Sequence, residues 1–495
     1  MTTTAETPID TEFEVVIGLE VHSQLLTKSK MFCRCSTGYA NDAPNTHVCP
    51  VCMGMPGVLP VINEEAVAYT IMTALALNCT IPEFSKFDRK SYPYPDLMKG
   101  YQISQYDIPL SQNGYLNINL HGRERTIGIT RVHLEEDTAR LLHHEGYSLI
   151  DVNRAGTPLM EIVSEPDMRS PEEARLYMQK LREILVYLGV ASGRMEEGSL
   201  RCDANISVRL RGQQALGVKT EIKNMNSFRS VERALEYEAQ RQIAVIRDGG
   251  TIHQETRGWV ETRGVTVSQR TKEKANDYRY FPEPDLPPLL ISRAQVEEIR
   301  GNLPELPDQR RARYRAEFGL NEQDANVMTE DKSLGDYFEH VMNASNVKDR
   351  QARARIASNW VLSEVVRLLK AHGATAQNSP LAPAAVANLL DLLDQERITG
   401  KQAKEVLDEA FATGELPAAI VTRKGIKPPI SDQGTLERII EEVIANNPKA
   451  ANDYRSGKMN AIKSLIGQVM KQTLGQARAD IVRPLLEKKL GETQG

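Results

Sequence analysis

The sequence has no apolar run long enough to cross a membrane, since a transmembrane helix needs about 20 consecutive apolar residues. The stretch Met1–Asp10 has no lysine, no arginine and no apolar core, so we expect neither a signal peptide nor an Arg-rich transit peptide. Six cysteines in a chain of 495 residues do not form the pattern of a disulfide framework. Together these absences predict a soluble protein of a reducing, cytoplasmic compartment.

Several catalytic motifs are absent as well. No Gly-x-x-x-x-Gly-Lys-Ser/Thr string occurs, so any ATP would be bound by something other than a P-loop. There is no Gly-x-Ser-x-Gly elbow and no obvious nucleophilic cysteine with local histidine support, which argues against a nucleophilic hydrolase. The sequence also shows no internal repeat, no low-complexity tract and no heptad pattern.

The net charge is small, −5, so the protein as a whole is not a polycation that would bind nucleic acid everywhere. The charge is unevenly spread along the sequence, because residues 449–489 contain nine basic residues but only three acidic ones. The basic residues are Lys449, Arg455, Lys458, Lys463, Lys471, Arg478, Arg483, Lys488 and Lys489. This end predicts a polyanionic partner, although a solvated helical face would show a similar pattern.

Length and a hydrophobic content of 41% allow about two to four domains. Up to about residue 290 the pattern predicts short alternating strands, with helices at Glu64–Asn78, Pro171–Leu188 and Val231–Asp248. The proline-rich segment Asp277–Pro288 forbids helix and predicts a boundary. Beyond it, apolar residues recur at helical spacing, which predicts a helical region.

Four cysteines form two close pairs, Cys33-x-Cys35 and Cys49-x-x-Cys52, separated by thirteen residues. Two such pairs can converge on one tetrahedral ion, and four thiolates suit Zn²⁺. Because four protein ligands leave the metal no open coordination position, we predict that it would stabilise this loop rather than take part in catalysis. The alternative is four reduced thiols without a metal. The two remaining cysteines stand alone and are expected to pack as small apolar side chains.

The stretch 15–25 alternates as a strand does, with four apolar residues on one side and Glu20, His22 and Gln24 on the other. A carboxylate beside an imidazole is a natural start for a metal or acid–base site. A half-exposed strand with a polar outer face would give the same pattern, so this pair alone leaves both interpretations open.

Carboxylates and cations alternate in the same way in four later stretches, 129–137, 151–161, 201–209 and 219–223. Carboxylates bind Mg²⁺, and arginine and lysine bind phosphate oxygens, so these polar faces together suit a site for Mg²⁺ and phosphate. The alternative is a solvated sheet face with surface ion pairs. The pattern does not decide between them, because it does not show which strands are neighbours.

Nine long strings occur in one order: GLEVHSQL, KFDRKSYPYPD, KGYQISQYD, HLEEDTAR, DVNRAGTPLMEIVSEPD, MEEGSLRCDANIS, EIKNMNSF, DYRYFPEPDLPPL and GQVMKQTLGQA. Together they resemble the B subunits of the tRNA-dependent amidotransferases, the GatB family. The similarity extends from about residue 14 to residue 490, far beyond a chance motif match.

The resemblance implies an ATP-dependent ligase that acts on Glu-tRNA(Gln), Asp-tRNA(Asn) or both. ATP phosphorylates the side-chain carboxylate, and ammonia from a glutaminase partner then gives Gln-tRNA(Gln) or Asn-tRNA(Asn). The chemistry is reasonable because a carboxylate resists ammonia until phosphorylation supplies a leaving group. The implied cofactors are ATP, Mg²⁺ or Mn²⁺, and structural Zn²⁺. The implied partners are the glutaminase (the A chain of such complexes), the small C chain and mischarged tRNA, with no membrane.

Several site residues follow from motif position. The resemblance implies a catalytic, magnesium-binding set of Glu20, His22, Glu136 and Glu161, and a zinc site made of the four cysteines. Candidates for the nucleotide cleft are Lys90, Tyr92, Arg201, Asp203 and Lys223, and candidates for tRNA contacts are Arg455, Lys458, Lys463 and Lys471. At Thr138–Arg140 the chain departs from the Ala-Gly-Lys usual in the family, so a phosphate contact of Arg140 is not carried over.

Pattern and resemblance together predict an α+β fold, with a cradle of mostly antiparallel strands followed by helical domains. The predicted parts are a disordered N-terminus (1–12), a cradle domain (13–295) with a zinc knuckle at 33–52, a helical connecting region (296–345) and a helical tRNA-binding tail (346–495).

Two other functions fit parts of the sequence. A non-catalytic, zinc-containing tRNA-binding scaffold would explain the cysteines and the basic end but would leave Glu20, His22, Glu136 and Glu161 without a role. A free-standing ligase would use ammonia directly. Because nothing in the sequence resembles a Ser-Ser-Lys amidase, we expect a separate glutaminase. ATP turnover that depends on the four residues would distinguish an enzyme from a scaffold.

Overall fold

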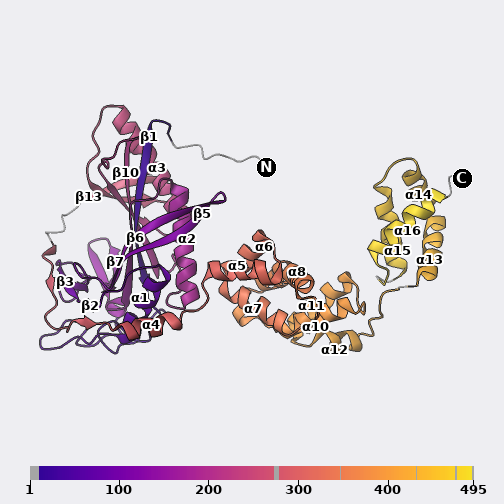
Figure 1. Cartoon of the computed structure of the whole chain (residues 1–495), viewed down its shortest axis with the longest axis horizontal. Helices are drawn as coiled ribbons and strands as arrows, with labels where there is room; N and C mark the ends of the chain where they lie inside the picture. The colour runs from indigo at the N-terminus through magenta and orange to yellow at the C-terminus, as the bar shows by residue number, and fades with distance from the viewer. Residues whose placement is uncertain (1–9, 272–277, 346, 431, 474–475, 493–495) are drawn as a thin grey trace. The chain divides into compact units, whose positions relative to one another are not determined.

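The computed structural model describes residues 10–271, 278–345, 347–430, 432–473 and 476–492. It divides into two compact units, Met1–Pro307 and Asp308–Gly495, each described here by itself (Figure 1). Most of the predicted disordered segment 1–12 lies outside the described residues. Among the described helices, none combines the length and apolarity that crossing a bilayer requires.

The first unit is built on a sheet of eight strands. In spatial order they are β13 (Val265–Thr271), β12 (Glu255–Val260), β11 (Thr220–Met225), β10 (Leu200–Leu210), β1 (Phe13–Gln24), β9 (Pro158–Ser164), β6 (Arg123–Glu136) and β5 (Ser111–Leu120). Every neighbouring pair is antiparallel except β11 and β12, which are parallel. The predicted cradle of mostly antiparallel strands is therefore confirmed.

Three helices, α1 (Glu64–Ala76), α2 (Pro171–Leu188) and α3 (Phe228–Arg247), pack on the apolar side of this sheet (Figure 1). On β1, Ile17 and Val21 are fully buried in the resulting core, while Glu20, His22 and Gln24 on the other face stay partly exposed. The three helices predicted from the sequence are confirmed to within a few residues at their ends. Helix α2 begins and ends where its residues favour it: Ser170 caps its first turn and Gly189 ends it at a φ of 71°.

The remaining elements of this unit are short. They are β2 (Phe84–Ser85), β3 (Asp88–Ser91), β4 (Tyr101–Ser104), β7 (Arg140–His144), β8 (Tyr147–Asp151), β14 (Phe281–Pro282), β15 (Leu289–Leu290) and α4 (Arg293–Gly301). The proline-rich segment predicted as a boundary lies near the end of the strands of the first unit: β14 pairs with β3, β15 pairs with β2, and every described element after β15 is helical. Pro282 lies in β14, the edge strand of its sheet, where no further ladder donor is needed.

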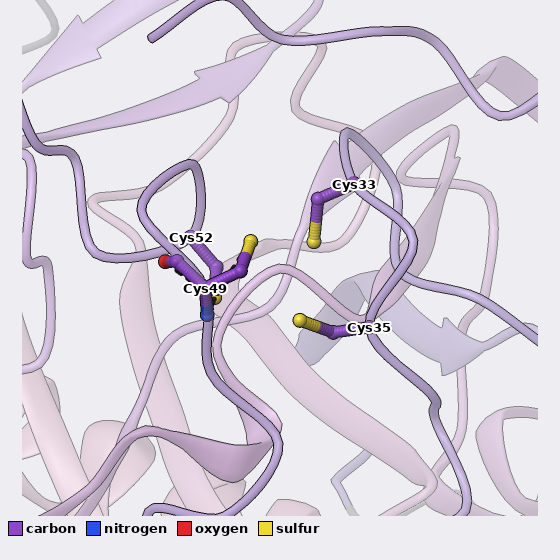
Figure 2. Close-up of side chains that lie close together, drawn as sticks. All are labelled: Cys33, Cys35, Cys49 and Cys52. Atoms are coloured by element: carbon purple, nitrogen blue, oxygen red, sulfur yellow. Dashed lines mark hydrogen bonds between the residues drawn. The ribbon is translucent and has the colours of Figure 1, made fainter.

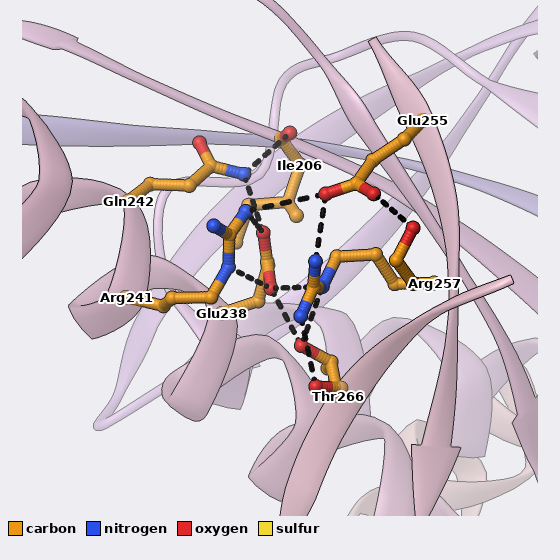
Figure 3. Close-up of polar contacts among 8 residues, drawn as sticks. Ile206, Glu238, Arg241, Gln242, Glu255, Arg257 and Thr266 are labelled. Atoms are coloured by element: carbon orange, nitrogen blue, oxygen red, sulfur yellow. Dashed lines mark hydrogen bonds and ion pairs between the residues drawn. The ribbon is translucent and has the colours of Figure 1, made fainter. Parts of the chain in front are cut away.

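A buried ionic network fastens α3 to the outer strands (Figure 3). Glu238 is fully buried and accepts hydrogen bonds from Arg241, at 2.6 and 2.9 Å, and from the Thr266 hydroxyl, at 2.8 Å. Arg257 Nε lies 3.4 Å from the same carboxylate and donates to Thr266 Oγ1 at 2.9 Å. One carboxylate thus holds the helix against both β12 and β13.

The second unit is helical, as predicted. Its α-helices are α5 (Pro307–Phe318), α6 (Glu322–Glu330), α7 (Lys332–Asn343), α8 (Arg350–Trp360), α9 (Val366–Ala371), α10 (Pro383–Asp394), α11 (Gly400–Thr413), α12 (Pro417–Arg423), α13 (Gln433–Asn446), α14 (Pro448–Arg455), α15 (Ala461–Gln472) and α16 (Ala479–Glu492). A π-helical turn, Val361–Val365, joins α8 to α9, and a short 3-10 helix, Ala376–Asn378, precedes α10. Apolar residues of α5 to α12 form one core and those of α13 to α16 form another. Residues on both sides of the predicted border at 345/346 contribute to the first of these cores.

Candidate functional site

The side chains of His22, Glu135 and Glu161 meet on the polar face of the large sheet, near the ends of three adjacent strands. His22 on β1 and His133 on β6 both stand opposite Glu161 on β9, the strand between them. His22 Nε2 lies 3.6 Å from Glu161 Oε2 and 3.7 Å from Glu135 Oε1. One ligand atom from each of His22, Glu135 and Glu161 lies within 4.8 Å of the other two, so the three can hold a metal ion. This trio is called the His22 cluster below.

Burial and mutual charge shift the ionisation of the His22 cluster. Burial acts first to raise the pKa of Glu135, and the charge of Glu161 raises it further. Burial also acts to raise the pKa of Glu161, but His133 and His22 together hold it well below its usual value. Although burial favours its neutral ring, hydrogen bonding and charge from Glu161 raise the pKa of His22 to about 9. Such opposed shifts are typical of functional sites.

Glu20 lies on the same face of β1 as His22, one position further along the alternation. Its Oε1 accepts a hydrogen bond from Asn205 Nδ2 at 2.9 Å, and it stands opposite Asp203 on β10. Asp203 in turn pairs with Lys223 on β11. The predicted residues Glu20, Asp203 and Lys223 therefore lie in a row that leads from the His22 cluster across β10 to β11.

The structure does not place Glu136 in the His22 cluster, which differs from the predicted magnesium set. Glu136 Oε1 accepts a hydrogen bond from the Ile103 backbone N–H at 2.9 Å and pairs with Lys99. Adjacent residues of a strand point to opposite faces, so Glu135 reaches the cluster and Glu136 does not. His133 and Glu135 are absent from the predicted set, although their alternation on one face was a signal for them.

Cationic side chains lie close to the His22 cluster. Arg201 stands opposite His22, and its Nη2 lies 2.9 Å from Asp137 Oδ2. Burial acts to raise the pKa of Asp137, but Arg201 and Arg154 hold it below its usual value. Lys90 Nζ lies 4.9 Å from the ring centre of Tyr278 and 5.9 Å from that of Tyr92. The charge of Lys90 also acts on Glu135, which links this cation to the cluster.

The four paired cysteines converge, as the spacing predicts (Figure 2). The four Sγ atoms all lie within 4.8 Å of one another, and Cys49 Sγ is 3.9 Å from Cys52 Sγ. Sulfurs bound to one tetrahedral zinc at about 2.3 Å would be about 3.8 Å apart, so the donor set fits that ion. A hydrogen bond from Cys33 lowers the pKa of Cys52 to about 5, and the same bond raises the pKa of Cys33, so Cys52 is the thiolate of this pair.

The predicted tRNA-contact residues lie on the last helices. Arg455 ends α14, Lys458 follows it, and Lys463 and Lys471 lie on α15 with exposed side chains. Lys458 Nζ forms an ion pair with Asp453 at 2.9 Å, and Arg455 Nε donates to the Leu490 carbonyl at 3.4 Å. The structure thus gathers these cations on one small helical core.

Comparison with known proteins agrees with this arrangement. Residues 15–297 match the model of the GatB/GatE catalytic domain and residues 336–490 match the GatB domain. The chain belongs to the GatB family. The first match spans the whole sheet and the His22 cluster, and the second spans most of the helical unit.

Close relatives in the GatB family cover nearly the full length of the chain. A protein of Carboxydothermus hydrogenoformans is 53% identical over 486 residues, which are 97% of this chain and 99% of that protein. A protein of Moorella thermoacetica is 55% identical over 483 residues, 97% of this chain and all of that protein. Both are named as the B subunit of aspartyl/glutamyl-tRNA(Asn/Gln) amidotransferase.

Proposed function

We propose that this chain is the part of a tRNA-dependent amidotransferase that activates and amidates the amino acid of mischarged tRNA. The names of its full-length relatives support the reaction, and the His22 cluster is the single observation that supports placing it in this chain. The substrate would be Glu-tRNA(Gln), Asp-tRNA(Asn) or both.

The proposed reaction has two steps. A carboxylate oxygen of the amino acid attacks the γ-phosphorus of ATP, forming an acyl phosphate and releasing ADP. Ammonia then attacks the acyl carbon, phosphate leaves, and a proton is lost to give the amide. Phosphoryl transfer between anions depends mainly on positioning and on charge stabilisation, so the site needs fixed cations more than a nucleophile.

The His22 cluster fits a divalent ion bound to phosphate. Glu135 and Glu161 supply the oxygen donors that Mg²⁺ prefers, and the imidazole of His22 makes Mn²⁺ an alternative. When bound, the ion would offset the negative charge of the phosphates. His133 Nε2, 3.3 Å from Glu161 Oε2, would keep that carboxylate ionised and oriented. Glu20 is two residues from His22 on the same face of β1, about 7 Å along the strand, so it would reach the same ion only through water.

The polar face beyond Glu20 offers space for the nucleotide. A cavity of about 270 Å³ lies beside Glu20, and its walls include Gly18, Ser207 and Lys219. Gly18 and His22 are four residues apart on an extended strand, about 13 Å, which is comparable with the length of a nucleoside triphosphate. Base and ribose in the cavity would therefore place the phosphates near the His22 cluster and within reach of Arg201, Lys223 and Lys90.

Zinc in the cysteine cluster would have a structural role. Four thiolates would leave the ion no open coordination position. The knuckle already contacts the turn before β9, because Lys30 Nζ donates to the carbonyls of His47 at 2.8 Å and Val152 at 3.3 Å. Fixing the loop at residues 33–52 would therefore also stabilise the segment that leads to Glu161.

The proposed partners follow from the reaction. The relatives are B subunits by name, so further chains belong to their assemblies. For this chain we expect a glutaminase (the A chain) that makes ammonia, a small C chain, and mischarged tRNA bound by the basic tail. The tail would contact RNA phosphates by charge and shape rather than by reading bases. The cytoplasm is the expected compartment for such a complex.

The test uses the complex co-purified with its partner chains, supplied with mischarged tRNA, ATP and ammonium. Ammonium bypasses the glutaminase, so the assay reports the steps proposed for this chain. Glu161→Gln should abolish both amide formation and tRNA-dependent ADP release while leaving glutaminase activity and tRNA affinity intact. Full activity of that variant would mean that this chain is a zinc-containing, tRNA-binding scaffold without catalytic activity of its own.

A further inference from the structure

A single buried carboxylate, Asp137, connects the strands that carry the site residues. It follows β6 directly, and its side chain is 2% exposed. Its Oδ2 accepts a hydrogen bond from Gln24 Nε2, at the end of β1, at 2.7 Å. The same oxygen lies 2.9 Å from Arg201 Nη2, near the start of β10, and Arg154 Nε lies 3.8 Å from Oδ1. Asp137 therefore has charged or polar partners from β1, β10 and the turn before β9.

The backbone of Asp137 strengthens this link. Its N–H donates to the Thr157 carbonyl at 2.8 Å, and its carbonyl accepts from the Gly156 N–H at 2.8 Å. These two bonds fix the end of β6 to the turn that begins β9. Glu135 and Glu161 lie on those two strands, so their separation depends on this junction.

Arg201 is more exposed than Asp137, which indicates that Asp137 holds the guanidinium from inside the protein while Arg201 faces the ligand. The side chain of Arg201 is 36% exposed, whereas its partner carboxylate is almost fully buried. A guanidinium has three nitrogens in a fixed fork: Nη2 faces Asp137, Nε is buried without a hydrogen-bond partner among the described residues, and Nη1 is the nitrogen left for a ligand. Arg201 is also the residue opposite His22 in the register of β1 and β10.

We propose that Asp137 is a positioning residue that holds the Arg201 guanidinium beside the His22 cluster, ready to bind phosphate oxygens of the nucleotide. The inference rests on the proposed function, which supplies ATP as the source of those oxygens. A cation already fixed in place costs no reorganisation when phosphate charge develops, which is the usual advantage of a preorganised site. A free arginine on a strand edge would have to be ordered at each turnover.

The test is a double-mutant cycle in the complete complex, with ammonium as the nitrogen donor and saturating mischarged tRNA. The variants are Asp137→Asn, Arg201→Leu and the two combined, and the readout is the KM for ATP beside kcat and the KM for tRNA. Asp167→Asn is the matched control, because Asp167 accepts a backbone hydrogen bond from Gly128 at 2.9 Å and lies outside the network. We expect Asp137→Asn to raise the KM for ATP about tenfold or more, with the KM for tRNA unchanged.

The combined variant decides whether Asp137 acts through Arg201. If it does, adding Asp137→Asn to Arg201→Leu changes the KM for ATP less than about twofold, because the effects of coupled residues do not add. Additive effects, or an unchanged KM in either single variant, would overturn the inference. Should Asp137→Asn alone fail to fold, the comparison of Arg201→Leu with the double variant remains, since removing both partners leaves no buried unpaired charge. The proposed function is judged separately, on Glu161→Gln.

Discussion

Glu135 and Glu136 are neighbours in the chain, yet their side chains lie on opposite faces of β6. Glu135 Oε1 is 3.7 Å from His22 Nε2, whereas Glu136 Oε1 accepts a hydrogen bond from the Ile103 N–H at 2.9 Å. The two glutamates thus have the same chemistry and the same strand but different surroundings. This makes them a matched pair for testing where the metal binds.

Replacing Glu135 with glutamine should cost far more activity than replacing Glu136. Glu135→Gln removes a carboxylate oxygen from the proposed metal site, so we expect ammonium-dependent amidation to fall by at least about 100-fold. Glu136→Gln keeps an acceptor for Ile103 and loses only the pairing with Lys99. Both complexes would be assayed for amide formation and for Mg²⁺ dependence. A larger loss in Glu136→Gln would reverse the assignment and restore the set expected from the motif.

The position of Glu135 shows what the sequence can and cannot predict about the site. Alternation on β1 correctly places Glu20 and His22 on one polar face, because a strand with a buried face has only one register. On β6 the register shifts between Ile129 and Arg131, so residues on either side of the shift change faces, but both glutamates come after it and alternate regularly. A pattern of residue types cannot locate such a bulge or show which strands adjoin. Family resemblance supplies the motif but not the choice between two adjacent glutamates.

The fold is more predictable than the site because it depends on patterns that cover many residues. The prediction of Pro171–Leu188 matches the structure to the residue, since a serine cap, a proline in the first turn and a following glycine mark both ends. The predicted boundary at Asp277–Pro288 lies close to the change from strands to helices, since every described element after β15 is helical, although the two compact units divide later, after Pro307. Proline shows that a segment is extended, but its pairing with β3 depends on contacts far away in sequence.

Removing the charge of Glu238 should destabilise the first unit. Glu238→Gln leaves Arg241 and Arg257 without their buried carboxylate, and breaking such a pair costs about 3–5 kcal/mol. Unfolding in urea, followed by circular dichroism, would measure the loss. The matched control is Glu236→Gln, an exposed glutamate on the same helix, for which little change is expected. Equal stability of the two variants would show that the network in Figure 3 contributes no net stability.

Exposed lysines of the last helices should contribute to tRNA affinity through charge. Lys463→Gln and Lys471→Gln should each weaken binding of mischarged tRNA and reduce the slope of log K against log salt concentration by about 1. Lys458 is expected to matter less, because it already pairs with Asp453. The control is Lys28→Gln, which removes an exposed charge from the first unit. Salt slopes that stay the same in the two tail variants would argue against phosphate contacts there.

Zinc should be present at about one atom per chain and should depend on the converging cysteines, because four sulfurs within 4.8 Å fit a tetrahedral ion. Cys52→Ser should lose the metal when the purified complex is analysed by elemental spectrometry. Cys79→Ala, a change at a buried cysteine outside the cluster, should retain it.

Loss of zinc should also loosen the knuckle, since metal binding to such a loop is part of its folding free energy. In Cys52→Ser we therefore expect faster proteolysis within residues 33–52 than in Cys79→Ala. The loop then stays tied to the turn before β9 by direct hydrogen bonds, from the His47 N–H to Asn153 Oδ1 and from the Val152 N–H to Asn45 Oδ1, both at 2.8 Å, and through Lys30. Weaker bracing of that turn should lower kcat for ammonium-dependent amidation without changing the stoichiometry of the complex. A zinc-free complex with unchanged proteolysis and unchanged kcat would show that these hydrogen bonds hold the knuckle in place without the metal.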